Sequence, residues 1–165
     1  MKQKVVIGGV RFNCGTQLGA VGRVAERIAQ RRYDHPISVF TPNTEQLIQA
    51  VDNQGFLELL NNSDMRVPDS VGLVRADWWR AFTTGRPWWL RERVAGVDLA
   101  EALLSEAAIK GWKVGLIGGM GNASELAVVN LKKRFSGLKV WGVRVGEVDI
   151  KIQSPKSKFQ NPKYK

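Results

Sequence analysis

Apolar and polar residues alternate along this chain with two different spacings. Short apolar runs, typical of buried strands, occur at residues 5–10, 37–40, 65–68, 113–117 and 138–143. Between them, apolar residues recur at helical spacing, which predicts helices over residues 17–32, 44–51, around 56–60, 98–110 and 122–136. Strands that alternate with helices predict an α/β fold, with an open, mostly parallel sheet and helices on both faces, as in Rossmann-like proteins.

Length and composition narrow the class of protein. The chain has 165 residues and 44% hydrophobic residues, enough for one domain with a buried core. We expect this domain over residues 1–148 and a basic, disordered tail over 149–165. One cysteine (Cys14) and one histidine (His35) exclude an intrachain disulfide and a multi-histidine metal site. No apolar run is long enough for a membrane span and no signal peptide precedes the first strand, so we expect a cytoplasmic protein.

The charge of the chain is strongly positive. The net charge is +10, and five lysines of residues 151–165 supply half of it. Such a balance attracts nucleic acid, anionic lipid and phosphorylated substrates alike, so it selects none of them.

Three polar residues follow the ends of two predicted strands. Thr41 and Asn43 come after the strand at 37–40, and Asp69 comes after the strand at 65–68. Ligands bind at this edge of an open α/β sheet, which makes the three side chains candidates for an active site, with Asp69 as a general base. Each of them is also a common helix-capping or turn residue, and from the residues alone this reading of Asp69 has more support.

Two further segments are candidates for binding phosphate. The glycine-rich turn at 115–123 joins a strand to a helix, whose N-terminus favours anions, although an ordinary tight turn has equal support. The segment 91–99 holds Arg91 and Arg93, which form either an arginine fork for a diphosphate or a solvated loop before a helix.

The stretch from Asp77 to Arg91 has the most unusual composition. It holds four tryptophans interleaved with arginines. We predict that the segment Trp78–Trp89 meets a membrane, with its rings among the lipid headgroups and its arginines on lipid phosphates. Burial in the core and stacking on nucleic-acid bases remain the alternatives.

In order along residues 5–146, four elements resemble the WecG/TagA/CpsF family of bacterial glycosyltransferases. The elements are Thr41-Pro-Asn43, Pro68-Asp69 followed by Val71-Gly72, the segment Glu92-Arg-Val-Ala-Gly-Val-Asp-Leu99, and Leu116-Ile-Gly-Gly119. The resemblance implies a transferase that moves a sugar, commonly N-acetylmannosamine, from a UDP donor. It implies as acceptor an amino sugar linked to undecaprenyl diphosphate at the cytoplasmic membrane face, in the synthesis of a surface polysaccharide or teichoic acid.

The resemblance also implies roles for individual residues. Asp69 is placed as the catalytic base and Thr41 as its hydroxyl partner. The expected substrate-binding residues are Asn43, Gly72, Arg93, Gly118 and Gly119. With one carboxylate to deprotonate the acceptor hydroxyl, we expect an inverting transfer. No Asp-x-Asp pair is present, so we expect no metal or other cofactor, and arginine and a helix N-terminus balance the charge of the leaving UDP.

The chain departs from the family pattern at several points. Asn13 stands where the family often has aspartate, and Ser70 stands where the family usually has glycine after the catalytic aspartate. The family's later Gly-x-Pro-Lys-Gln-Glu element is not found before Lys165. We therefore expect a shortened or minimal copy that is peripheral at the inner membrane face, with self-association left open. The alternatives are an inactive nucleotide-binding homologue and, less favoured, a basic nucleic-acid-binding protein.

Overall fold

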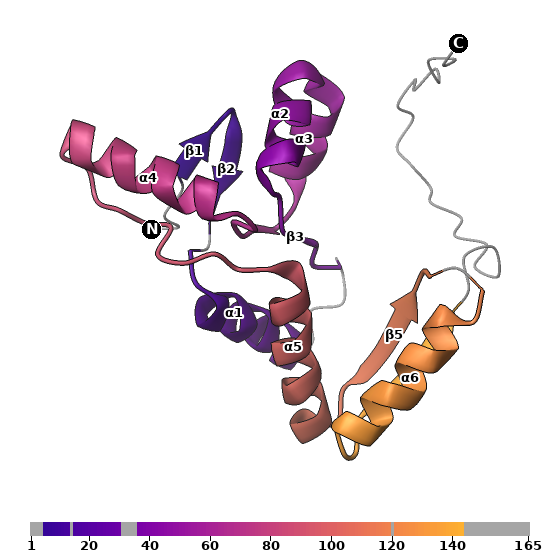
Figure 1. Cartoon of the computed structure of the whole chain (residues 1–165). Coiled ribbons are helices and arrows are strands. Elements are labelled where there is room, and N and C mark those ends of the chain that lie inside the picture. Colours follow the sequence, from indigo (N-terminus) through magenta and orange to yellow (C-terminus); the bar gives the residue numbers. More distant parts are fainter. Residues whose placement is uncertain (1–4, 14, 31–35, 120, 144–165) are drawn as a thin grey trace, which may run out of the picture. The chain divides into compact units, whose positions relative to one another are not determined.

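A computed structural model describes residues 5–13, 15–30, 36–119 and 121–143. The chain divides into two compact units, residues 1–110 and residues 111–165 (Figure 1). Each unit contains strands and helices, which confirms the predicted α/β class. The tail expected at 149–165 lies outside the described residues.

The first unit contains most of the elements. They are β1 (Val5–Ile7), β2 (Val10–Phe12), α1 (Gln17–Ala29), β3 (Val39–Phe40), α2 (Thr44–Asp52), α3 (Gln54–Asn62), β4 (Met65–Arg66), α4 (Val71–Thr84) and α5 (Gly96–Lys110). The second unit contains β5 (Lys113–Ile117), α6 (Ala123–Arg134) and β6 (Lys139–Val143).

The described strands pair in three two-stranded sheets. β3 pairs with β4 and β5 pairs with β6, both parallel, as expected for strands joined through helices. β1 and β2 instead form an antiparallel hairpin. The prediction of one continuous strand over residues 5–10 is therefore wrong. Gly8 and Gly9 have φ angles of 55° and 79°, a conformation that glycine adopts readily, and they turn the chain back.

Side chains of β3 and β4 join two separate apolar clusters. Phe40 packs against a cluster around Phe12, Leu47 and Leu73, which the hairpin, α2, α3 and α4 supply. Val39 and Met65 belong with a second cluster, supplied mainly by α1 and α5, which lie side by side in Figure 1. Helices thus cover both faces of this parallel pair, and both strands are fixed firmly where they end.

A buried arginine fastens the strand that leads to Asp69. Arg66 is only 3% exposed, and its guanidinium donates to the carbonyl oxygens of Arg11, Leu60, Asn61 and Ser63. The carbonyls of Leu60, Asn61 and Ser63 lie at the C-terminal end of α3, where the helix dipole favours a cation. Burial lowers the pKa of Arg66, and the nearby charge of Arg11 lowers it further, against the opposing effect of Asp64. The contacts tie β4 to β2 and to α3.

The two helices that begin beside Asp69, α4 and α5, start at residues where no helix start was predicted. α4 covers most of the tryptophan-rich stretch, for which the apolar spacing predicted no helix; it begins after the N-cap Ser70 and ends at Gly85, whose φ is 64°. α5 begins at Gly96, two residues before the Asp98 start that the sequence predicted. No described helix is long and apolar enough to cross a membrane.

In the second unit, α6 packs against β5 and β6. All five residues of β5 pair with β6, from Lys113 with Lys139 to Ile117 with Val143. After Ile117 the chain enters the glycine-rich turn before α6.

Candidate active site

The segments after β3 and β4 stay paired beyond the strands. Val67 N donates to Phe40 O, and Asp69 N donates to Pro42 O, each at 3.0 Å. Because the strands are parallel, Thr41 and Asp69 lie at the same edge, as the sequence predicted. Pro42 and Pro68 are both fully buried, so the backbone that carries the two polar residues is packed on both sides.

Asp69 is held at both of its carboxylate oxygens. Oδ1 accepts from Arg93 Nε at 3.0 Å and lies 3.0 Å from Arg93 Nη2. Oδ2 accepts from the backbone N–H of Gly96 at 3.1 Å. The side chains of Asp69 and Arg93 are 23% and 50% exposed, so solvent and a ligand can reach this pair.

Gly96 is the first residue of α5, and Asp69 therefore lies at the N-terminus of that helix. A carboxylate there accepts one of the unpaired N–H groups of the first turn and is favoured by the helix dipole. Two other helices begin close by. α2 starts at Thr44, just after the segment that pairs with Asp69, and α4 starts at Val71. The N-cap residues of α2 and α4 are Asn43 and Ser70.

Thr41 lies against the start of α5. A Cβ atom on Gly96 would be 2.9 Å from Thr41 Oγ1, closer than such contacts normally come, so only glycine leaves room for this hydroxyl. Within the described residues, no hydrogen bond to Thr41 Oγ1 is formed. The hydroxyl is next to the Gly96 N–H that binds Asp69, and its expected role as partner of the base remains a prediction.

The structure gives Asn43 and Gly72 local structural roles. Asn43 Oδ1 accepts from Gln46 N at 2.9 Å, and Gln46 Oε1 accepts from Asn43 N, which is a capping box. Gly72 N donates to the N-cap Ser70 Oγ, which also lies 2.8 Å from Thr44 Oγ1. Both residues lie beside Asp69 in the fold, and their expected contacts with substrate remain predictions.

A strap over residues 86–95 carries Arg93 to this edge. Val94 N donates to Pro68 O at 2.8 Å, which sets the strap beside the segment that carries Asp69. Further back, the N–H groups of Arg91 and Glu92 donate to Gly15 O. Glu92 Oε1 accepts from Gln17 N at the start of α1.

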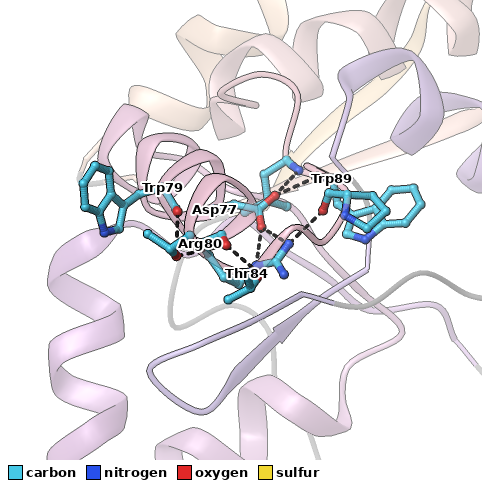
Figure 2. Close-up of polar contacts among 8 residues, drawn as sticks. Asp77, Trp79, Arg80, Thr84 and Trp89 are labelled. Carbon is cyan, nitrogen blue, oxygen red and sulfur yellow. Dashed lines mark hydrogen bonds and ion pairs between the residues drawn. The ribbon is translucent and has the colours of Figure 1, made fainter.

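The other end of the strap is held by a residue that the sequence pattern did not single out. Asp77 on α4 is fully buried, and its Oδ2 accepts from the N–H groups of Trp89 and Leu90, each at 2.8 Å (Figure 2). Its Oδ1 pairs with Arg80 Nη2 at 2.7 Å, and Arg80 also donates to Pro87 O. A lone aspartate in an aromatic segment gives little signal for such a role, because only the folded loop brings its donors together.

Gly118 and Gly119 belong to the second unit, at the turn between β5 and α6. Their φ angles are 124° and 84°, which glycine adopts readily and L-residues rarely do. A Cβ on Gly119 would lie 2.9 Å from the Cβ of Ala123, so the turn passes close to the start of α6. The N-cap Asn122 makes no side-chain capping bond, and the expected role of this turn in nucleotide binding remains a prediction.

Comparison with known proteins gives one consistent family. The sequence matches the "Glycosyl transferase WecG/TagA/CpsF family" over residues 5–158. It is also similar to proteins from two Staphylococcus aureus strains, MRSA252 and NCTC 8325, each named N-acetylglucosaminyldiphosphoundecaprenol N-acetyl-beta-D-mannosaminyltransferase. Each is 29% identical to this chain over 135 residues, which are 82% of this chain and 50% of the relative. The chain thus spans about half the length of the curated relatives it matches.

Proposed function

This chain belongs to the WecG/TagA/CpsF family of glycosyltransferases, and we propose that it transfers a hexosamine from a UDP-sugar to a sugar carried on a polyprenyl diphosphate. The observation that carries the proposal is the contact of Asp69 with both Arg93 and the N-terminus of α5, beside the hydroxyl of Thr41. The relatives' name supports N-acetylmannosamine as the transferred sugar and N-acetylglucosaminyldiphosphoundecaprenol as the acceptor. In this proposal the product enters synthesis of a surface polysaccharide or teichoic acid.

Asp69 acts as the general base. It takes the proton of the acceptor hydroxyl while that oxygen attacks the anomeric carbon of the donor. The bond from this carbon to the UDP oxygen breaks, and its electron pair leaves with UDP. A single displacement of this kind inverts the anomeric centre. The half-buried carboxylate is reachable, and its Oδ2 retains a lone pair beyond the bond from Gly96 N, while two Arg93 nitrogens lie against Oδ1.

Arg93 binds the donor diphosphate. Two of its five N–H donors face Asp69, which leaves three for phosphate oxygens while the contact with the base persists. An ion pair this exposed contributes at most about 1 kcal/mol to the stability of the fold. The Asp69–Arg93 pair is therefore better explained by a role in binding than by a role in folding. With the start of α5, Arg93 supplies the positive potential that stabilises the leaving UDP, and this supports a transfer without a metal.

Thr41 orients the acceptor hydroxyl toward Asp69, and Asn43 and Gly72 shape the donor site at the starts of α2 and α4. Gly118 and Gly119 bind the nucleotide through the turn before α6. The protein works at the inner membrane face, where its lipid-linked acceptor is found.

The direct test is a transfer assay with the full chain. The donor is UDP-N-acetylmannosamine with a radiolabelled sugar, and the acceptor is N-acetylglucosaminyl diphosphate on a short polyprenol. Product formation that needs both substrates supports the proposal. Binding of UDP, measured as thermal stabilisation, without any transfer would indicate an inactive nucleotide-binding homologue. Salt-sensitive binding of RNA with no response to UDP would instead indicate a nucleic-acid-binding protein.

A further inference from the structure

One side of α4 exposes large aromatic side chains to solvent. Trp78, Trp79 and Phe82 are 50%, 60% and 73% exposed. Their rings pack against one another, with centroids 5.9 Å apart for Trp78 and Phe82 and 6.1 Å apart for Trp79 and Phe82. We call these three residues, with the half-exposed Val71, the α4 aromatic face.

The helical repeat separates this face from the core. Val71, Arg75, Trp78 and Phe82 follow the spacing of three and four residues that places side chains on one side of a helix. Leu73 and Asp77 are the buried residues of α4 and lie on the other side. Figure 2 shows the ring of Trp79 directed away from the strap, while Asp77 points toward it. The side of α4 that packs against the rest of the first unit is therefore the side without exposed aromatic residues.

The structure divides the tryptophans of the predicted membrane segment into two pairs. Trp89 is half-buried and packs against the core, and Trp88 is half-buried with the guanidinium of Arg91 5.0 Å from its ring centre. Packing against the core accounts for Trp89, and Trp88 lies in the strap against Arg91. Neither contact involves Trp78 or Trp79. Of the predicted membrane segment Trp78–Trp89, only the part on α4 therefore remains a candidate for contact with a membrane.

The exposed charged residues of α4 and of the segment that follows it to Arg91 are all arginines. Residues 71–91 contain four arginines and a single acid, Asp77, which is buried and paired with Arg80. Arg75 lies within the aromatic stripe, and Arg86 follows the end of the helix; both are exposed. Tryptophan rings favour the headgroup layer of a bilayer, and arginines beside them pair with lipid phosphates.

We propose that the α4 aromatic face docks on the surface of a bilayer that contains anionic phospholipid. This inference rests on the proposed function, because docking on a membrane would bring Asp69 to the lipid-linked acceptor. α4 begins two residues after Asp69, so a helix lying in the headgroup layer holds the candidate base close to that layer. Its 14 residues span about 21 Å, long enough for several lipid contacts.

A second copy of the chain fits this face less well. An interface between two such faces would bring their arginines together, and the only acid of residues 71–91 is buried. Nucleic-acid bases could stack on the rings, but these already pack on one another, which leaves no gap between them for a base.

Fluorescence quenching by brominated lipid tests which tryptophans meet the bilayer. The full chain is mixed with vesicles of brominated phosphatidylcholine and phosphatidylglycerol, and Trp78→Phe/Trp79→Phe is compared with Trp88→Phe/Trp89→Phe. Phenylalanine keeps an apolar ring at each position, which favours retention of the fold. The proposal expects the first variant to lose most of the quenching and the second to keep it. The reverse result, or quenching that neither pair changes, would overturn the proposal.

Co-sedimentation with vesicles tests the binding strength. Trp78→Ser/Trp79→Ser/Phe82→Ser should lower partition by about tenfold or more, since three exposed aromatic rings no longer insert. The control is Ile48→Ser/Val51→Ser/Leu59→Ser, which removes side chains that are 60%, 63% and 54% exposed elsewhere in the first unit. Salt at about 0.5 M screens the basic tail in all samples. Equal loss in both triple variants, or a parent chain that dimerises or binds RNA through α4 and ignores vesicles, would contradict docking on a membrane.

The same triple variant separates this inference from the proposed function. With a short, water-soluble polyprenol acceptor, it should turn over as the parent does, while turnover on vesicle-bound acceptor falls. Vesicle binding through α4 by a chain without transferase activity would support docking of the α4 aromatic face and refute the proposed function. Normal turnover together with vesicle binding that does not depend on α4 would support the proposed function and refute docking through this face.

Discussion

Arg93 contacts Asp69 through two guanidinium nitrogens, each 3.0 Å from the same carboxylate oxygen, although 24 residues separate the two in the chain. The candidate base and the candidate diphosphate-binding residue are therefore one connected group. The half-exposed arginine keeps further donors for a ligand, so we expect a negatively charged donor to bind beside the base.

Replacing Arg93 by alanine should weaken UDP far more than uridine. A charge-assisted hydrogen bond contributes about 1.5–3 kcal/mol, which corresponds to a loss of roughly ten- to 150-fold in affinity. Calorimetric titration with both ligands measures the difference. Arg91→Ala, on the same strap but stacked on Trp88, should leave both affinities nearly unchanged. Equal losses for UDP and uridine in Arg93→Ala would indicate a structural role for the arginine.

Replacing Asp77 by alanine should destabilise the fold strongly. The change leaves two backbone N–H groups and the Arg80 guanidinium without their buried acceptor, a defect that costs about 3–5 kcal/mol in comparable pairs. Urea unfolding measures the change. Asp52→Ala, at an exposed position at the end of α2, should stay within about 0.5 kcal/mol of the parent. A loss below about 1 kcal/mol in Asp77→Ala would mean that the strap does not depend on this carboxylate.

Two glycine-to-alanine changes should have opposite effects. At Gly22, inside α1, a Cβ meets no atom within 4 Å, so alanine should stabilise the fold by about 0.5–1 kcal/mol. At Gly96 the added Cβ would lie 2.9 Å from Thr41 Oγ1 and displace that hydroxyl. We expect Gly96→Ala to lower turnover with no gain in stability. A more stable Gly96→Ala chain with normal turnover would show that the close approach of Thr41 is not needed.

The Ser38–Asp64 contact should add a pH-dependent contribution to stability. Hydrogen bonding from the Ser38 backbone, the largest cause, lowers the pKa of Asp64, and the Ser38 hydroxyl and Arg27 add to the effect against the cost of burial. A lowered carboxyl pKa stabilises the fold above the ordinary value and loses this effect as pH falls through the folded value. Asp64→Asn should thus be less stable than the parent near pH 7, with a difference that shrinks in acid. A difference that grows as pH falls would reverse the assigned sign; thermal unfolding across pH measures it.

Local patterns predicted the parts of the site that depend on neighbouring residues. The apolar runs that became β3 and β4 located Thr41 and Asp69, and the capping role of Asn43 was one of the two sequence interpretations. The contact of Asp69 with Arg93 was not predictable from their spacing in the sequence. Hydrogen bonds to Asp77 and Gly15, which are distant in the chain, fix the path of the strap that carries Arg93. α4 was missed because its aromatic residues face solvent while an aspartate is buried, the reverse of the pattern that marks an amphipathic helix.

The most direct test of the account is the turnover of Asp69→Asn in the transfer of N-acetylmannosamine from UDP to the lipid diphosphate acceptor. Asparagine keeps the shape of the side chain and removes its ability to take a proton. Turnover should therefore fall by about 10²–10⁴-fold while UDP affinity changes little. Asp98→Asn, which alters an exposed acid in the first turn of α5, should behave as the parent does. Parent-like turnover in Asp69→Asn, or no transfer by the parent chain itself, would contradict the account.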